Sequence, residues 1–154
     1  AEKYDMPILY SCHPRSRNRL AASGFKLDPR VIQHEPLGFH DYNCLQMNAF
    51  AVVSDSGTLP EESSFFTSIG HPFPAICIRT STERPEAIDK GDFIIAGIDE
   101  KSLLQAVDTA VELCKDGQHG IPVPDYVDEN VSTKVVKIVQ SYVSIVNKMV
   151  WRRF

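Results

Sequence analysis

A short polar turn, residues 54–62, carries the residue types that can bind an anionic ligand. It reads Ser-Asp-Ser-Gly-Thr-Leu-Pro-Glu-Glu and follows an apolar run at residues 50–53. A turn with glycine lets an anion approach backbone N–H groups, and a helix that begins there adds partial positive charge. The carboxylates of Glu61 and Glu62 can accept hydrogen bonds from hydroxyl groups but cannot bind phosphate. The turn therefore predicts a site for a nucleotide or nucleotide sugar; alternatively, Ser56 and Thr58 only cap the helix.

Five short apolar runs, separated by segments that favour helix, predict the elements that position this turn. They are Pro7–Ser11, Val31–His34, Ala51–Ser54, Ala75–Ile78 and Phe93–Gly97. Apolar strands that alternate with helices predict an α/β fold, with a parallel sheet covered by helices on both faces. Ligands of such sheets bind beyond the carboxyl ends of the strands. That edge would carry His13, residues 35–42, residues 55–58 and residues 79–84.

Composition excludes several classes of partner. The chain has 154 residues and a net charge of −4, with 16 basic and 20 acidic residues and no long basic run, so we expect no nucleic-acid partner. No apolar stretch approaches the ~20 residues needed to cross a bilayer, and the N-terminus lacks a signal-peptide pattern, so we expect no membrane partner and a cytoplasmic location. The four cysteines have no zinc-ligand spacing, and we expect buried free thiols.

The C-terminal part of the chain predicts two helices joined by a polar connector. One begins at Asp99 and reaches Cys114, and the other runs from Val131 to Trp151 with apolar residues on two adjoining stripes. So wide an apolar face predicts contact with a missing domain or another subunit, unless the helix is buried within this domain. We therefore divide the chain into a Rossmann-like domain at residues 1–124, truncated at its N-terminus, and a docking helix at residues 125–154.

Four motifs together resemble the UDP-N-acetylglucosamine 2-epimerases. They are His13-Pro14, Glu35-Pro36-Leu37 with Tyr42, the turn at residues 54–62, and Thr80-Ser81-Thr82-Glu83-Arg84-Pro85-Glu86-Ala87. Their order and spacing resemble the carboxy-terminal half of such an enzyme over nearly the whole chain. The resemblance implies the second Rossmann-like domain of a glycosyltransferase-B fold, in which two domains face each other across a UDP-sugar cleft. It also implies the missing amino-terminal domain as a partner, and we expect a homodimer.

The resemblance implies a role for seven residues. His13 would lie near the nucleotide phosphates, Tyr42 would pack on uracil, and Glu62 would accept hydrogen bonds from the ribose hydroxyls. Ser56, Gly57 and Thr58 would form the diphosphate turn, although the family often has glycine where Thr58 stands. Arg84 would approach the phosphates with its forked guanidinium.

Each of these roles has an alternative that the sequence leaves open. His13 could cap a helix that begins near Pro14, and Tyr42 could belong to the core. Glu61 could contact the ribose in place of Glu62, and Arg84 could pair with Glu86.

The family's reaction inverts C2 of a hexosamine by elimination and re-addition of UDP, and it implies no metal or other cofactor. This half would stabilise the UDP leaving group through Arg84 and backbone N–H groups. The catalytic base would lie in the missing half, so the chain alone should be inactive. Segments 37–43, 80–87 and 130–151 are more similar to capsule and O-antigen enzymes acting on UDP-2-acetamido-2,6-dideoxy-L-talose. The alternatives are a glycosyltransferase donor-binding domain or a non-enzymatic nucleotide-sugar-binding domain.

Overall fold

The computed structural model describes residues 1–153, which form two compact units. Unit 1 is Ala1–Asn48, and unit 2 begins at Ala49. Each unit has its own parallel sheet, two-stranded in unit 1 and three-stranded in unit 2. The predicted parallel α/β class is confirmed, but the five strands form two hydrogen-bonded sheets rather than the one that the sequence predicted. The predicted division at residue 124 separates a domain from a helix that docks on another body, and it stays a prediction.

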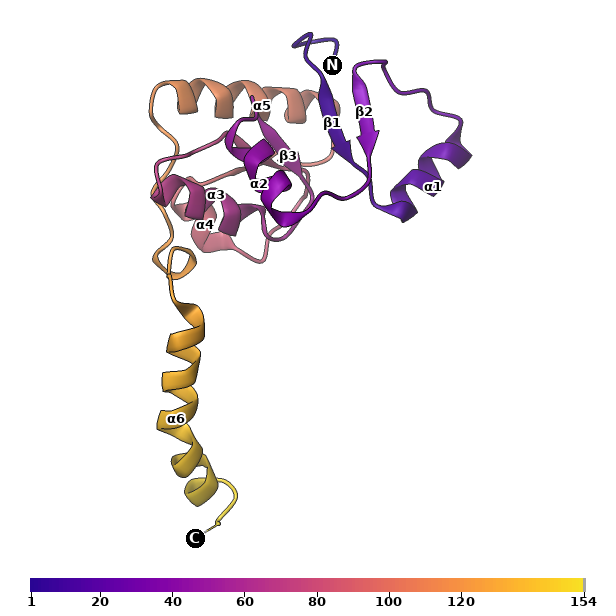
Figure 1. The fold of residues 1–154 in the computed structure, drawn as a ribbon. Coiled ribbons are helices and arrows are strands. Elements are labelled where there is room, and N and C mark those ends of the chain that lie inside the picture. The colour runs from indigo at the N-terminus through magenta and orange to yellow at the C-terminus, as the bar shows by residue number, and fades with distance from the viewer. Residues whose placement is uncertain (154) are drawn as a thin grey trace. The chain divides into compact units, whose positions relative to one another are not determined.

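Unit 1 is built around two neighbouring strands, β1 (Ile8–Ser11) and β2 (Val31–His34), which lie side by side in Figure 1. They pair in parallel, with Ile8 opposite Val31 and Ser11 opposite His34. Helix α1 (Pro14–Ser23) connects them, and helix α2 (Phe39–Met47) follows β2. The fixed φ of Pro14 suits the first turn of α1. Gly24 ends the helix in the left-handed conformation, with φ of 68°.

The sheet of unit 1 is less buried than the sequence predicted. Leu9 and Ile32 are each 49% exposed, and no residue of β1 or β2 is buried, although the structure describes both strands in full. Two strands and two helices supply too few side chains to cover both faces of a sheet. The expectation of helices covering both faces is therefore not met within this unit.

Unit 2 contains strands β3 (Val52–Ser54), β4 (Ala75–Cys77) and β5 (Ile94–Ile95), in that order across the sheet. Helices α3 (Leu59–Ser68), α4 (Pro85–Asp89) and α5 (Glu100–Lys115) follow the three strands in turn. All three residues of β4, the central strand, are buried. The buried apolar residues of this unit include Leu59, Phe66, Phe73, Ile76, Ala87, Phe93, Val107 and Val111.

A connector ties the end of α5 back to the core of unit 2. The backbone N–H of Ile121 donates to the Lys90 carbonyl over 2.9 Å, and the N–H of Val123 donates to the buried Ser64 hydroxyl over 2.6 Å. A 3-10 turn at Pro124–Tyr126 follows. These bonds fix the path of the chain as far as Val123.

Helix α6 (Val131–Met149) is the last element, and its predicted start is confirmed. None of its residues is buried, although the structure describes the whole helix. Its exposed apolar side chains are Val131, Val135, Val136, Ile138, Val139, Tyr142, Val143, Ile145, Val146 and Met149. The alternative of a helix buried within this chain is therefore wrong. Within residues 1–153, no helix combines the length and apolar character needed to cross a bilayer.

The cysteines differ in burial. All four are free thiols, as expected, and Cys12 and Cys77 are buried. Cys44 is exposed on α2, which corrects the expectation that every thiol would be buried. Burial raises the pKa of Cys77 and of the half-buried Cys114, so neither thiol is activated.

Candidate functional site

The polar turn that the sequence singled out joins β3 to α3, as predicted. Its far end is fixed because Leu59 is fully buried and Pro60 lies in the first helical turn. Its near end is fixed by a hydrogen bond of 3.0 Å from the Ser56 N–H to the Ser54 hydroxyl. Backbone N–H groups in the first turn of a helix have no acceptor within the helix, so this end of α3 can bind an anion.

The hydroxyl groups of the turn form a chain that ends on a glutamate. The Ser56 and Thr58 hydroxyl oxygens lie 2.9 Å apart, and Thr58 Oγ1 donates to Glu62 Oε1 over 2.7 Å. Thr58 occupies the position before the helix, yet its side chain makes no capping hydrogen bond. The capping alternative is therefore wrong for Thr58, whereas the Ser56 hydroxyl does accept a hydrogen bond of 3.3 Å from the Thr58 N–H. The turn holds the Glu62 carboxylate instead.

Arg84 lies beside the first turn of α3. Its Nε donates to Glu61 Oε1 over 2.8 Å, and its Nη2 lies 2.7 Å from the same oxygen. This bond raises the pKa of the guanidinium further. The alternative of an Arg84–Glu86 ion pair is wrong, because Glu86 accepts a hydrogen bond from Tyr126 and Arg84 pairs with Glu61. The structure thus brings the turn, both glutamates and Arg84 together in unit 2.

A second arginine, Arg79, belongs to the range that the sequence placed at the ligand-binding edge, but no role was predicted for it. Arg79 follows β4, and its Nη1 lies 3.9 Å from the position that a Cβ would have on Gly57. Its guanidinium also donates to Glu83 over 2.8 Å. The signal was available, because Arg79 stands at the carboxyl end of a strand, where ligand-contacting residues of parallel sheets gather.

The two remaining predicted residues, His13 and Tyr42, lie in unit 1. His13 is exposed and stands before α1, where its Nδ1 accepts a hydrogen bond of 3.2 Å from the Arg15 N–H. His13 therefore caps α1, as the alternative predicted. Tyr42 lies on α2, is half-buried, and its hydroxyl accepts a hydrogen bond of 3.1 Å from Gln46. Their contacts with a nucleotide stay predictions.

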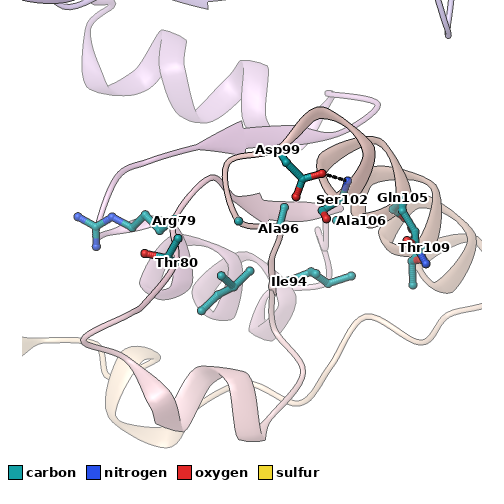
Figure 2. Close-up of a pocket in the computed structure, with 11 residues that line it drawn as sticks. Arg79, Thr80, Ile94, Ala96, Asp99, Ser102, Gln105, Ala106 and Thr109 are labelled. Atoms are coloured by element: carbon teal, nitrogen blue, oxygen red, sulfur yellow. Dashed lines mark hydrogen bonds between the residues drawn. The ribbon is translucent and has the colours of Figure 1, made fainter.

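An open cavity of about 550 Å³ lies in unit 2 between β5 and α5 (Figure 2). Its lining includes Arg79 and Thr80 at one end and Ser102, Gln105 and Thr109 of α5 at the other. Asp99 caps α5 by accepting a hydrogen bond of 2.9 Å from the Ser102 N–H, which confirms the predicted helix start. Among the described residues, no cluster of three or more His, Cys, Asp or Glu side chains could hold a metal ion.

Comparison with proteins of known sequence gives relatives of one kind. The enzymes named UDP-N-acetylglucosamine 2-epimerase from Methanocaldococcus jannaschii and Methanococcus maripaludis are 32% and 31% identical to the chain over 111 and 123 residues. These matches cover 70% and 77% of this chain but only 29% and 31% of the archaeal enzymes. A relative from Pseudomonas aeruginosa, 27% identical over 105 residues, is named UDP-2,3-diacetamido-2,3-dideoxy-D-glucuronate 2-epimerase. The chain thus spans less than a third of the length of these curated relatives.

Comparison with solved structures agrees. The UDP-N-acetylglucosamine 2-epimerase of Rickettsia bellii superposes with a TM-score of 0.83 at 38% identity, covering 99% of this chain and 41% of that one. The M. jannaschii enzyme, solved in complex with UDP-GlcNAc and UDP, has a TM-score of 0.76 at 26% identity, with 91% and 37% covered. The family model described as UDP-N-acetylglucosamine 2-epimerase matches residues 1–140. With a match over that length and a fold of the same glycosyltransferase-B type, this chain belongs to the UDP-N-acetylglucosamine 2-epimerase family.

Proposed function

We propose that this chain is the UDP-binding half of a UDP-N-acetylhexosamine 2-epimerase. The observation that carries the proposal is the turn between β3 and α3. The N-terminus of α3, the Glu62 carboxylate that Thr58 orients, and Arg84 lie together there, in a chain that belongs to this family. The M. jannaschii relative, whose structure contains UDP-GlcNAc and UDP, supports the choice of ligand.

In this proposal the residues of unit 2 divide the nucleotide between them. The turn at Ser56, Gly57 and Thr58 holds the diphosphate at the N-terminus of α3, whose first backbone N–H groups favour negative charge. Within the turn, the Ser56 and Thr58 N–H groups already donate to the Ser54 and Ser56 hydroxyls over 3.0 and 3.3 Å. Glu62 accepts hydrogen bonds from the ribose hydroxyls, for which its carboxylate is already oriented by Thr58. Arg84 supplies a permanent positive charge, held in place by Glu61. In unit 1, His13 and Tyr42 are proposed to contact the phosphates and uracil.

The catalytic contribution of this half is stabilisation of the leaving group. When the bond between C1 and the UDP oxygen breaks, negative charge develops on the β-phosphate. Donors that are already oriented toward that charge lower the barrier, because they need no reorganisation during the reaction. Removal of the C2 proton requires a base, which we propose is supplied by an amino-terminal domain. We therefore expect the 154-residue chain to bind UDP without catalysing epimerisation.

The same proposal gives the exposed face of α6 an occupant. Side chains such as Ile138 and Val139, which are 58% and 52% exposed, would be covered by the amino-terminal domain. Without that domain, two copies of the chain would cover each other's helices. A cytoplasmic setting, where nucleotide sugars are made, fits this function.

The sugar is a further part of the proposal. Residues 37–43, 80–87 and 130–151 favour UDP-2-acetamido-2,6-dideoxy-L-talose and a role in capsule or O-antigen synthesis. A protein that joins this chain to its amino-terminal domain should epimerise that substrate faster than UDP-N-acetylglucosamine. Equal rates on both sugars, or a preference for the glucosamine derivative, would overturn this assignment while leaving UDP binding intact.

Isothermal titration of the chain with UDP tests the proposed function. We expect saturable binding that Glu62→Ala and Arg84→Ala each weaken by about 1–3 kcal/mol, the usual cost of leaving a hydrogen-bonding partner unsatisfied. Glu112→Ala, on the exposed side of α5, is the matched control and should leave binding unchanged. Absence of binding by the unaltered chain, or equal loss in the control, would contradict the proposal.

A further inference from the structure

Arg79 lies against the turn that we assign to the diphosphate. Its Nη1 is 3.9 Å from the place of a Cβ on Gly57, the middle residue of the turn. Its backbone is held by the sheet, because the Arg79 carbonyl accepts a hydrogen bond of 3.1 Å from the Gly97 N–H. Figure 2 shows the Arg79 side chain extending away from Ser102 and Gln105 of α5. The guanidinium therefore belongs to the turn rather than to the interior of the α5 cavity.

Arg79 can leave its present partner, Glu83, with little loss of folding free energy. Arg79 pairs with Glu83 four residues later, over 2.8 Å, and the two side chains are 33% and 67% exposed. Exposed ion pairs stabilise a fold very little, so a phosphate could replace the glutamate. The pKa of Glu83 is lowered first by a backbone hydrogen bond and then by Arg79, so its carboxylate stays charged after the exchange.

Arg84 is bound differently. Two of its nitrogens contact the same oxygen of Glu61, and its backbone N–H is held by the Thr82 hydroxyl over 3.0 Å. Much of its charge is therefore already compensated before a ligand arrives. A diphosphate at the turn would also lie near the Glu62 carboxylate, so a second cation there would offset the repulsion between the two negative groups.

We propose that Arg79 is a phosphate-binding residue that leaves Glu83 when the diphosphate binds at the turn, and that Glu83 competes with the ligand for it. This inference rests on the proposed function. It adds to the same site a positive charge, that of Arg79, whose availability depends on Glu83. It predicts opposite effects for the two partners. Removing Arg79 weakens binding of phosphate-bearing ligands, whereas removing the charge of Glu83 strengthens it.

The absence of a side chain at residue 57 fits this arrangement. A methyl group there would meet Arg79 Nη1 at ordinary contact distance, and the backbone of Gly57 is not in the left-handed region. Gly57→Ala should therefore fold normally. It would occupy the space between guanidinium and turn in which we place the phosphate, and it should weaken UDP binding.

NMR titration of the 154-residue chain with UDP, UMP and uridine tests the inference. We expect Arg79→Ala to weaken UDP binding about tenfold or more and UMP binding less, with uridine binding unchanged. Glu83→Gln should tighten UDP binding about two- to fivefold and leave uridine binding unchanged. The gain in Glu83→Gln cannot come from a folding defect, so it separates a ligand role from a structural one.

Three results would overturn the inference. One is an equal loss of UDP and uridine binding in Arg79→Ala. Another is unchanged UDP binding in Arg79→Ala while Glu62→Ala is weakened, which would leave the proposed function standing. A third is a loss rather than a gain in Glu83→Gln. If the unaltered chain does not bind UDP at all, the proposed function fails and this inference fails with it.

Discussion

The hydroxyl of Thr58 donates a hydrogen bond of 2.7 Å to Glu62 Oε1, one helical turn further along the chain. The Ser56 hydroxyl oxygen lies 2.9 Å from that of Thr58, so the three side chains form a continuous polar row along the start of α3. At the position before the helix, this chain has a residue that orients a carboxylate. Thr58 thus becomes a positioning residue for the proposed ribose contact.

Replacing Thr58 tests whether this hydrogen bond matters for binding. Thr58→Val removes the hydroxyl and keeps the shape of the side chain, so Glu62 loses a donor. We expect about a fivefold weaker affinity for UDP, or about 1 kcal/mol. Thr58→Ser keeps the donor and should bind as the unaltered chain does. Calorimetric titration measures both, and equal affinities for the valine and serine variants would argue against a positioning role.

Gly120 is the position at which we expect a substitution to damage unit 2 most specifically. A Cβ on Gly120 would lie 2.6 Å from the Gly91 carbonyl oxygen, and φ is +87°. Gly120→Ala therefore forces backbone apart as well as adding left-handed strain, and we expect a loss of about 3 kcal/mol or more in unfolding free energy.

Gly117 provides a matched comparison for that substitution. Its φ is +74°, but nothing lies within 4 Å of a Cβ placed on it. Gly117→Ala should cost about 1 kcal/mol, the strain alone. Urea unfolding followed by circular dichroism gives both values. Similar losses in the two variants would show that the contact with Gly91 adjusts without cost.

Asp92 should make stability depend on pH. It is 3% exposed, and burial raises the pKa of its carboxyl. The Ser64 hydroxyl and the Val123 N–H lie nearby and offset part of the rise, yet neither oxygen makes a hydrogen bond of good geometry within the described residues. Because the folded state binds the proton more tightly, stability falls as pH rises from the unfolded pKa through the folded one, and the loss persists at pH 7.

Asp92→Asn removes the charge at nearly constant shape. We expect it to raise the unfolding free energy by about 1 kcal/mol at pH 7, the size of a typical single substitution. The gain should vanish near pH 3, where the aspartate is protonated in both states. Asp89→Asn, on the exposed end of α4, is the control. A loss of stability at pH 7 in Asp92→Asn would show that the charged form is favoured.

The exposed face of α6 should cause association of the isolated chain. We expect a concentration-dependent dimer in size-exclusion chromatography with light scattering. Substituting Val139 and Val146, which are 52% and 36% exposed, by lysine should shift the chain toward monomer without changing its thermal stability. Lys137→Ala on the same helix leaves the apolar side chains in place and is the control. A monomer at high concentration in the unaltered chain would contradict the expectation.

Much of the fold could be predicted from the sequence because its signals are local. The runs of β-branched residues gave the strands within about two residues, and Asp99 marked the start of α5. The turn before α3 could be found because glycine, serine and proline occur together after an apolar strand. The wide apolar face of α6 correctly indicated a helix that its own chain does not bury.

Contacts that depend on side-chain geometry could not be predicted. Arg84 has acidic residues both near it in sequence and across the fold. It pairs with Glu61 because α3 lies beside α4, which the sequence does not show. The predicted sheet brought residues 55–58 and 79–84 to one edge, but it did not show that the Arg79 guanidinium would lie against Gly57. The burial of Cys44 was wrongly expected because α2 has little difference between its faces, which leaves the orientation of a small residue undetermined.

The bonds that hold the connector have a mechanical consequence for α6. The chain is fixed to unit 2 at Val123, whose N–H donates to the Ser64 hydroxyl, and again at Tyr126, whose hydroxyl donates to Glu86. Between Tyr126 and the helix lies only the segment 127–130, which ends at Asn130 with a positive φ of 56°. A body docked on α6 would therefore be tethered on a short arm with one fixed end. The length of this segment would limit how far such a body could lie from unit 2.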